Sequence, residues 1–142
     1  MKQFLQKTFG LRAWMIVAML TAVVSGAWAE KITDYTNIVS GKNYYIGATT
    51  GGTDYYLSVD GSSTTNQIAG TAITDASSAT VFTFSGSGTS WFIQFESGYY
   101  LSLKSSKDNG KVQVVEDAAT FTASNQSGKL RLTISGAYLV FA

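Results

Sequence analysis

The 142-residue sequence contains no cysteine, no histidine and no proline. Without cysteine the chain can form no disulfide, and it offers neither a thiol nucleophile nor a thiol for lipid attachment. Without histidine it excludes the imidazole-assisted catalytic triads and the histidine-ligated zinc sites. Stability must therefore come from the burial of apolar side chains, which a chain of this length can achieve as one domain.

The first 29 residues have the three regions of a secretory signal peptide. A basic start (Lys2, Lys7 and Arg12) precedes an apolar run over residues 13–26, and alanines stand at 27 and 29, before a cut at Glu30. A retained membrane anchor is the alternative, but a run of 14 residues is shorter than the roughly 20 that span a bilayer. We expect a helical signal peptide over 1–29 and a domain over 30–142 that is exported to the periplasm, the cell surface or the medium.

Basic residues are few and dispersed after residue 29. Residues 30–142 contain seven lysines and arginines against nine aspartates and glutamates, a formal charge of −2. Nucleic-acid binding requires clustered basic side chains, and binding to a membrane surface is typical of basic amphipathic helices. The sequence shows neither, so nucleic acid and, after signal cleavage, membrane are not expected partners.

Helical periodicity is also absent after residue 29, and short runs rich in β-branched and aromatic residues take its place. Gly, Asn, Asp and Ser separate these runs and suit tight turns. The pattern predicts an all-β domain, either a sandwich or a barrel. The expected strands are 36–38, 43–48, 55–59, 66–68, 80–84, 91–95, 99–103, 112–115, 119–123, 129–134 and 137–141.

An internal repeat distinguishes the barrel from the sandwich. Residues 55–59 (YYLSV) return as 99–103 (YYLSL) and, in weaker form, as 137–141 (AYLVF). Residues 79–84 (ATVFTF) return as 118–123 (AATFTA), and 91–95 (WFIQF) match 130–134 (LRLTI). A period of about 40 residues is typical of repeated supersecondary units that share one core.

Four-stranded units with a Tyr-Leu second strand and a Phe-bearing fourth strand resemble the β-trefoil family, in its ricin-like and fascin-like branches and of a secreted bacterial type. The resemblance covers residues 43–142 and implies a β-trefoil-like barrel; a β-sandwich or jelly roll is the alternative. A trefoil has three complete units, whereas the sequence stops at Ala142, after the second strand of the third unit. We therefore expect an incomplete third repeat and a chain truncated at its C-terminus.

Carboxylates are the remaining candidates for catalysis, since glycoside hydrolysis needs only two of them at a fixed separation. Most of them lie in expected turns, where an acid usually caps a backbone N–H, and the adjacent Glu116 and Asp117 would point to opposite faces of a strand. The segment 108–110 (DNG) is interpreted as a hairpin turn, because two lysines flank it and further calcium ligands are missing. We expect no enzyme activity, no metal and no cofactor.

Outward-facing tyrosines are the feature that points to binding. Period-two alternation places Leu57, Leu101 and Leu139 inward, so that Tyr56, Tyr100 and Tyr138 face outward, one in each unit. Such rings can stack on the apolar face of a sugar, beside hydroxyls such as those of Ser58 and Ser102. Covering the flank of the barrel is the alternative role for the same rings.

The resemblance itself does not supply a sugar site. Ricin-like members that bind sugars carry a Gln-x-Trp signature in the fourth strand, where this sequence has TVF (80–82) and TFT (120–122). Two functions remain: a secreted, non-catalytic module that binds a carbohydrate, or a structural or protein-interaction domain that forms the N-terminal part of a longer exported protein or hydrolase. The expected partner is a glycan in the first case and a cell-surface protein in the second.

Overall fold

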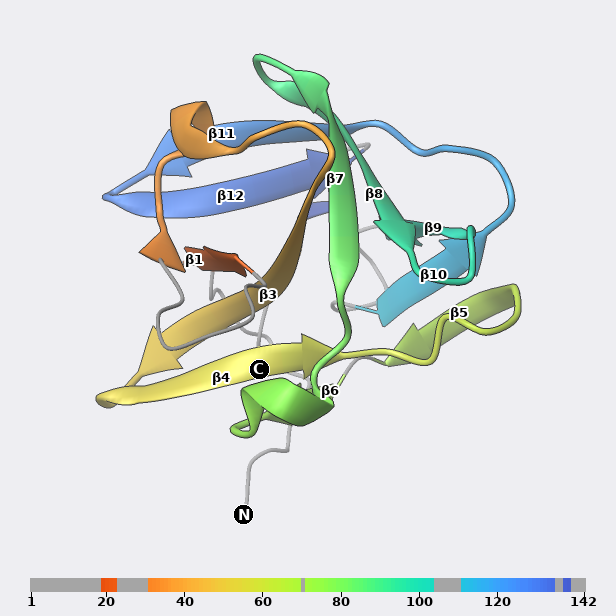
Figure 1. Cartoon of the computed structure of the whole chain (residues 1–142), viewed down its shortest axis with the longest axis horizontal. Coiled ribbons are helices and arrows are strands. Elements are labelled where there is room, and N and C mark those ends of the chain that lie inside the picture. The colour runs from red at the N-terminus through yellow and green to blue at the C-terminus, as the bar shows by residue number, and fades with distance from the viewer. Residues whose placement is uncertain (1–18, 23–30, 70, 104–110, 135–136, 139–142) are drawn as a thin grey trace.

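The computed structural model of the chain, shown in Figure 1, describes residues 19–22, 31–69, 71–103, 111–134 and 137–138; for 19–22, 65–69, 111 and 137–138 it describes the backbone alone. Almost every regular element in this part of the chain is a strand. The strands are β1 (Met19–Ala22), β2 (Lys31–Ile32), β3 (Lys42–Thr50), β4 (Thr53–Ser58), β5 (Thr65–Ala69), β6 (Thr71–Ile73), β7 (Phe82–Ser87), β8 (Ser90–Phe95), β9 (Tyr100–Leu103), β10 (Lys111–Val115), β11 (Phe121–Gln126), β12 (Lys129–Ile134) and β13 (Ala137–Tyr138). Two short 3₁₀ helices are η1 (Tyr35–Asn37) and η2 (Ala76–Ser78).

These strands form one sheet whose main path has the order β13-β12-β11-β8-β7-β3-β1-β2. The other strands branch from this path: β4 pairs with β3 and β6, and β9 pairs with β8 and with β10, which in turn pairs with β5. All the pairings among the described residues are antiparallel. The all-β class is thus confirmed. The expected closed barrel is not found, because β1 pairs with β3 and β2 and forms no ladder with β12 in the described residues.

Three hairpins have the same register. In β3–β4, β8–β9 and β12–β13 the tyrosine of the second strand lies opposite Gly47, Gln94 and Thr133, respectively. These three residues occupy the same place in the sequence repeat. The fourth strands also correspond, because Phe82 lies opposite Tyr44 and Phe121 lies opposite Trp91.

Alternation along the strands builds the core. In β8, Trp91, Ile93 and Phe95 are buried, whereas Phe92 between them is exposed. Aromatic rings fill the centre: Phe84 contacts Tyr44 edge-on at 5.4 Å between centroids, and its ring lies 6.4 Å from that of Trp91. Buried polar atoms have partners here, since the Val39 N–H donates to the Tyr44 hydroxyl at 2.9 Å and the Trp91 indole N–H donates to the Gly88 carbonyl.

The inward positions of the Tyr-Leu strands are confirmed where the structure describes them: Leu57, Val59, Leu101 and Leu103 are all buried. The third copy, Leu139 and Phe141, lies outside the described residues, as does the expected hairpin turn at 108–110. The strands β2 and β6 were not expected from the sequence, since two and three residues are too few to show periodicity.

The strand expected at 36–38 is wrong, because residues 35–37 form the helix η1. Asp34 caps this helix: its carboxylate accepts the Thr36 N–H at 2.9 Å and the Thr36 hydroxyl at 2.8 Å. A side-chain oxygen that satisfies the free N–H of a first turn stabilises the turn over an extended strand.

The helix expected over 1–29 is not found at Met19–Ala22, which form the strand β1. The main chain of β1 pairs with the otherwise unpaired edge of β3. This backbone pairing determines the conformation of residues 19–22 more strongly than their local helical propensity does. In the described residues no helix has the length and apolar character to cross a membrane.

Candidate functional site

Two pairs of aromatic rings stand on the outward face of the sheet. Tyr45 of β3 and Tyr56 of β4 pack edge-on with centroids 5.8 Å apart, and Phe92 of β8 and Tyr100 of β9 do so at 6.3 Å. Phe92 is 38% exposed and the three tyrosines are half-buried. Because the hairpin registers match, the two pairs occupy equivalent positions in their units.

The first pair lies beside an ion pair. The Lys31 ammonium is 2.7 Å from a carboxylate oxygen of Asp54, and the Thr49 hydroxyl donates to the other oxygen at 2.6 Å. Hydrogen bonds from Lys31 and Thr49 hold the pKa of Asp54 below its usual value. Partial burial, and then the negative charge of Asp54, raise the pKa of Tyr56 above its usual value of 10. Tyr56 is therefore a neutral hydroxyl at physiological pH, able to donate and accept hydrogen bonds.

The second pair lies beside a fixed amide. Gln94, opposite Tyr100 in the hairpin, donates from its Nε2 atom to the Gly98 carbonyl at 3.0 Å. This bond across the β8–β9 turn orients the amide next to the exposed rings. Each ring pair thus combines an apolar surface with hydrogen-bonding groups.

The expected site residues have different environments. Tyr56 and Tyr100 each belong to a ring pair, and Ser58 is half-buried at the end of β4, opposite Thr71. Ser102 is 9% exposed, so its hydroxyl is not on the accessible surface and we leave it out of the site. Tyr138 lies opposite Thr133, and its side chain is outside the described residues.

The partner rings Tyr45 and Phe92 were missed by the sequence reasoning. Their signal was present, because both precede an isoleucine and follow a large aromatic in the lead-in strand, at the outward position of a period-two pattern. Gly47, opposite Tyr56, carries no side chain that would lie between the rings of the first pair. The sequence search followed the tyrosine strand alone and so found one member of each pair.

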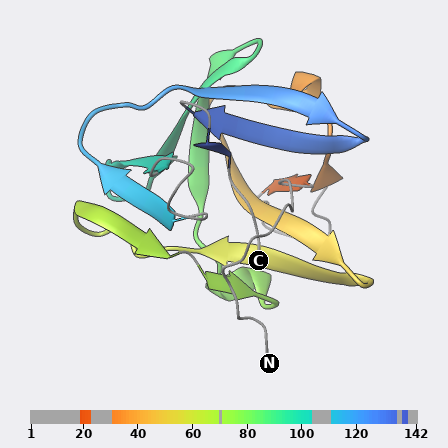
Figure 2. The same cartoon turned by 180° about the vertical axis from the view of Figure 1, so that it is seen from behind.

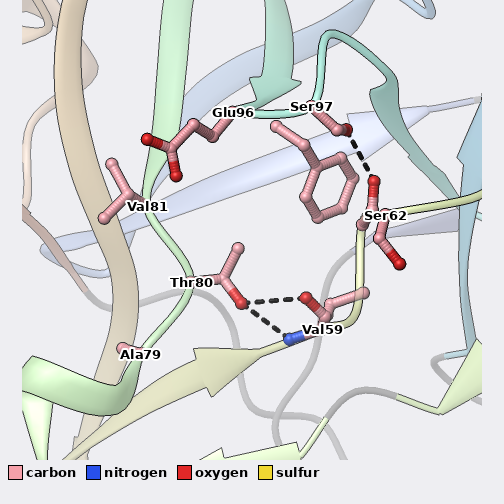
Figure 3. Close-up of a pocket in the computed structure, with 9 residues that line it drawn as sticks. Val59, Ser62, Ala79, Thr80, Val81, Glu96 and Ser97 are labelled. Atoms are coloured by element: carbon pink, nitrogen blue, oxygen red, sulfur yellow. Dashed lines mark hydrogen bonds between the residues drawn. The ribbon is translucent and has the colours of Figure 1, made fainter.

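A shallow pocket of about 490 Å³ lies apart from these residues, and Figure 3 shows its lining. Val59, Val81 and Phe95 supply its apolar surface; Glu96 lies near Val81, and Ser62 lies across the pocket beside Ser97. Thr80 fixes one wall, since its hydroxyl accepts the Val59 N–H at 2.8 Å and lies 3.0 Å from the Val59 carbonyl, to which it donates. No sequence pattern indicates this pocket, because its residues come from three separate segments.

Three of the carboxylates in the described part of the chain act as turn caps. Asp34, Asp60 and Asp75 each accept the backbone N–H two residues further on, and hydrogen bonds lower the pKa of all three. In the same part of the chain, no group of three or more Asp and Glu side chains could hold a metal ion. The hydrogen bonds of Asp34, Asp60 and Asp75 therefore stabilise turns.

One of these caps joins distant parts of the chain. The Asn125 side chain of β11 donates to the Asp34 carboxylate at 2.9 Å and accepts the Tyr35 N–H at 3.0 Å. The Asn125 amide is the main cause of the lowered pKa of Asp34, followed by the Thr36 N–H. The charged form of Asp34 is therefore favoured by the fold.

We expect Asn125→Ala to destabilise the protein at neutral pH and to have a smaller effect in acid. A carboxyl whose pKa is lowered on folding contributes stability above its unfolded pKa of about 3.9, and this contribution is lost as the pH falls through the lower, folded value. Thermal unfolding of both proteins at neutral pH and below about pH 3 measures the difference. Asp60, whose carboxylate accepts hydrogen bonds from the Ser62 N–H and hydroxyl, is the internal control: in the variant, an NMR titration should show a raised pKa for Asp34 alone. An unchanged Asp34 would contradict the assignment.

Comparison with known proteins finds no family model, no curated protein and no solved structure that matches this chain.

Proposed function

We propose that the chain is an exported, non-catalytic binding module with a repeat architecture related to the β-trefoil, and that its ligand is a carbohydrate. The observation that carries the proposal is the recurrence of an outward ring pair at the same hairpin position in two units. Export is supported by the charged start, the apolar run and the small residues before Glu30. The common register of the three hairpins supports the repeat.

Carbohydrate suits this surface for a physical reason. A pyranose ring has an apolar C–H face that stacks on an aromatic ring and a rim of hydroxyls that require hydrogen-bond partners. The Tyr45–Tyr56 pair has the Asp54 carboxylate and the Lys31 ammonium beside it, and the Phe92–Tyr100 pair has the Gln94 amide. Equivalent positions in successive units would also allow two sugars of one chain to bind, which raises avidity without new contacts.

Glycan-array binding of the purified protein tests the proposal, with Tyr56→Ala and Tyr100→Ala as the informative variants. Loss of a stacking ring is expected to weaken binding about tenfold at one site. Val39→Ala is the matched control, because Val39 is 54% exposed and belongs to neither ring pair. Binding should remain unchanged in this variant.

Glu96→Gln separates the ring pairs from the pocket. If the carbohydrate binds in the pocket, this substitution removes a charged hydrogen-bond acceptor from its lining and weakens binding, whereas the ring variants leave it intact. We expect the reverse result. No glycan bound by the wild-type protein would overturn the proposed function altogether.

A further inference from the structure

The strand β1 lies between β3, with which it pairs, and β12, which it contacts. It pairs with β3 in antiparallel register, with Leu20 opposite Ile46 and Ala22 opposite Tyr44, and it lies next to β12 (Figures 1 and 2). In Figure 1 it is the short red-orange arrow between the blue β12 and the gold β3. We use the name strand groove for the position that β1 takes along the β3 edge, over residues 44–47 and next to β12.

The register of β1 matches that of a fourth strand. In the β7–β8 pair, Phe84 lies opposite Ile93 and Gly86 lies opposite Trp91. Ile46 and Tyr44 correspond to Ile93 and Trp91 in the repeat, so Leu20 stands where Phe84 stands and Ala22 stands where Gly86 stands. In the β11–β12 pair the same position is taken by Ala123, opposite Leu132.

The strands at this position in the three units share a pattern of side chains. The three strands that take this position have an apolar residue (Leu20, Phe84 or Ala123), then a hydroxyl residue (Thr21, Ser85 or Ser124), then a small or short residue (Ala22, Gly86 or Asn125). In β7 and β11 the residues at the apolar position, Phe84 and Ala123, are fully buried. In β1 the apolar position lies opposite Ile46 in register and the hydroxyl position lies opposite Tyr45.

Cleavage before Glu30 would remove β1 and open the groove. The edge of β3 would then have unpaired backbone groups, and Tyr44 and Ile46 would lose a covering strand; such an edge readily pairs with another extended chain. A second copy of the protein is a poor donor, because its strands with the required pattern, β7 and β11, already bury Phe82, Phe84 and Phe121 in its own core.

We propose that the strand groove is a binding site for an extended segment of a partner polypeptide, which adds antiparallel to β3 with an apolar residue opposite Ile46. In the uncleaved chain β1 holds this site closed. The inference depends on the export part of the proposed function, since cleavage is what opens the groove, but it is independent of carbohydrate binding. It gives a structural basis to the protein-interaction role that the sequence left open.

The test uses the full-length chain and a fluorescent eight-residue peptide with the sequence of residues 80–87 (TVFTFSGS), whose binding is followed by anisotropy. Leu20→Asp should displace β1, because it places a charge opposite Ile46, and should increase peptide affinity at least about tenfold over wild type. Thr21→Asp is the matched control: neighbouring positions of an extended strand lie on opposite faces of a sheet, so a charge at position 21 should not act on the side of Ile46 and affinity should stay at the wild-type level.

A second peptide, in which Phe84 is replaced by aspartate, tests the specificity of the site. This peptide should not bind the Leu20→Asp variant of the protein. Leu20→Ala, a milder change, should give an intermediate affinity and covers the case in which Leu20→Asp does not fold. Equal affinities for wild type, Leu20→Ala and Thr21→Asp would overturn the proposal, as would concentration-dependent dimers of Leu20→Ala that the peptide does not dissociate. Amino-terminal sequencing of the exported protein tests cleavage separately: a chain that retains residues 19–22 overturns the opening of the groove, whatever the glycan array shows.

Discussion

Replacing Phe82 with alanine is expected to lower the free energy of unfolding by about 3–5 kcal/mol. The Phe82 side chain is completely buried, and its ring centroid lies 5.3 Å from that of Phe95 on the neighbouring strand. Truncation to alanine removes the buried ring and leaves a cavity that the surrounding strands cannot fully close. A domain of this size is stable by about 5–15 kcal/mol, so the variant would lose a large fraction of its stability.

Phe92→Ala is the matched control, since it makes the same substitution on the next strand at a side chain that is 38% exposed. Its expected cost is about 0.5–1.5 kcal/mol, from the lost edge contact with Tyr100. Urea unfolding of the three proteins, with equal m-values, gives the comparison. Similar costs for Phe82→Ala and Phe92→Ala would show that the core is not where the structure has it.

The second large effect is expected at Gly86, where alanine should destabilise the protein by about 2–5 kcal/mol. The Gly86 backbone has a φ of +148°, and a Cβ built there would lie 2.1 Å from the Ser90 carbonyl oxygen and 3.0 Å from the Trp91 Cα. Both atoms belong to the backbone of the paired strand β8, so no side-chain rotation can relieve the contact. The β7–β8 ladder would have to shift at its end.

Gly88→Ala separates the close contact from the backbone angle. Gly88 also has a positive φ, of +59°, but a Cβ there meets no atom within 4 Å. Only the cost of the left-handed conformation applies, which is about 1–2 kcal/mol. The midpoint temperature of thermal unfolding should therefore be clearly lower for Gly86→Ala than for Gly88→Ala. An equal loss in the two variants would mean that the β7 strand adapts freely to the added methyl group.

The sequence predicts those parts of the fold that rest on local alternation. Phe82, Ile93, Leu101 and Leu132 are buried as their period-two patterns require, and most expected strands are present. The helix η1 was missed because one capping aspartate decides it, while residues 36–38 are compatible with a strand. The pairing of β1 with β3 was missed because it depends on an open sheet edge, which no window of sequence shows.

The sequence predicts one ring of each aromatic pair in the candidate site. Alternation along the tyrosine strands identifies Tyr56 and Tyr100, but the rings they contact, Tyr45 and Phe92, come from the preceding strand. Alternation also places Tyr45 and Phe92 outward, but which tyrosine each ring contacts depends on the hairpin register and thus on the length of each turn. The burial of Ser102 was not predicted either, since it is decided by neighbouring elements and not by its place in the strand.

The burial of Trp91 has a spectroscopic consequence. Trp14 and Trp28 precede Glu30, so a chain that begins at Glu30 has Trp91 as its single tryptophan. Its indole is 3% exposed, lies against the Phe84 ring and donates to the Gly88 carbonyl. An indole in such dry surroundings emits at shorter wavelength than one in water, and its emission shifts to the red when water enters. A chain that begins at Glu30 would thus carry a single intrinsic fluorescent probe at the β7–β8 junction, with which its folding could be followed without any label.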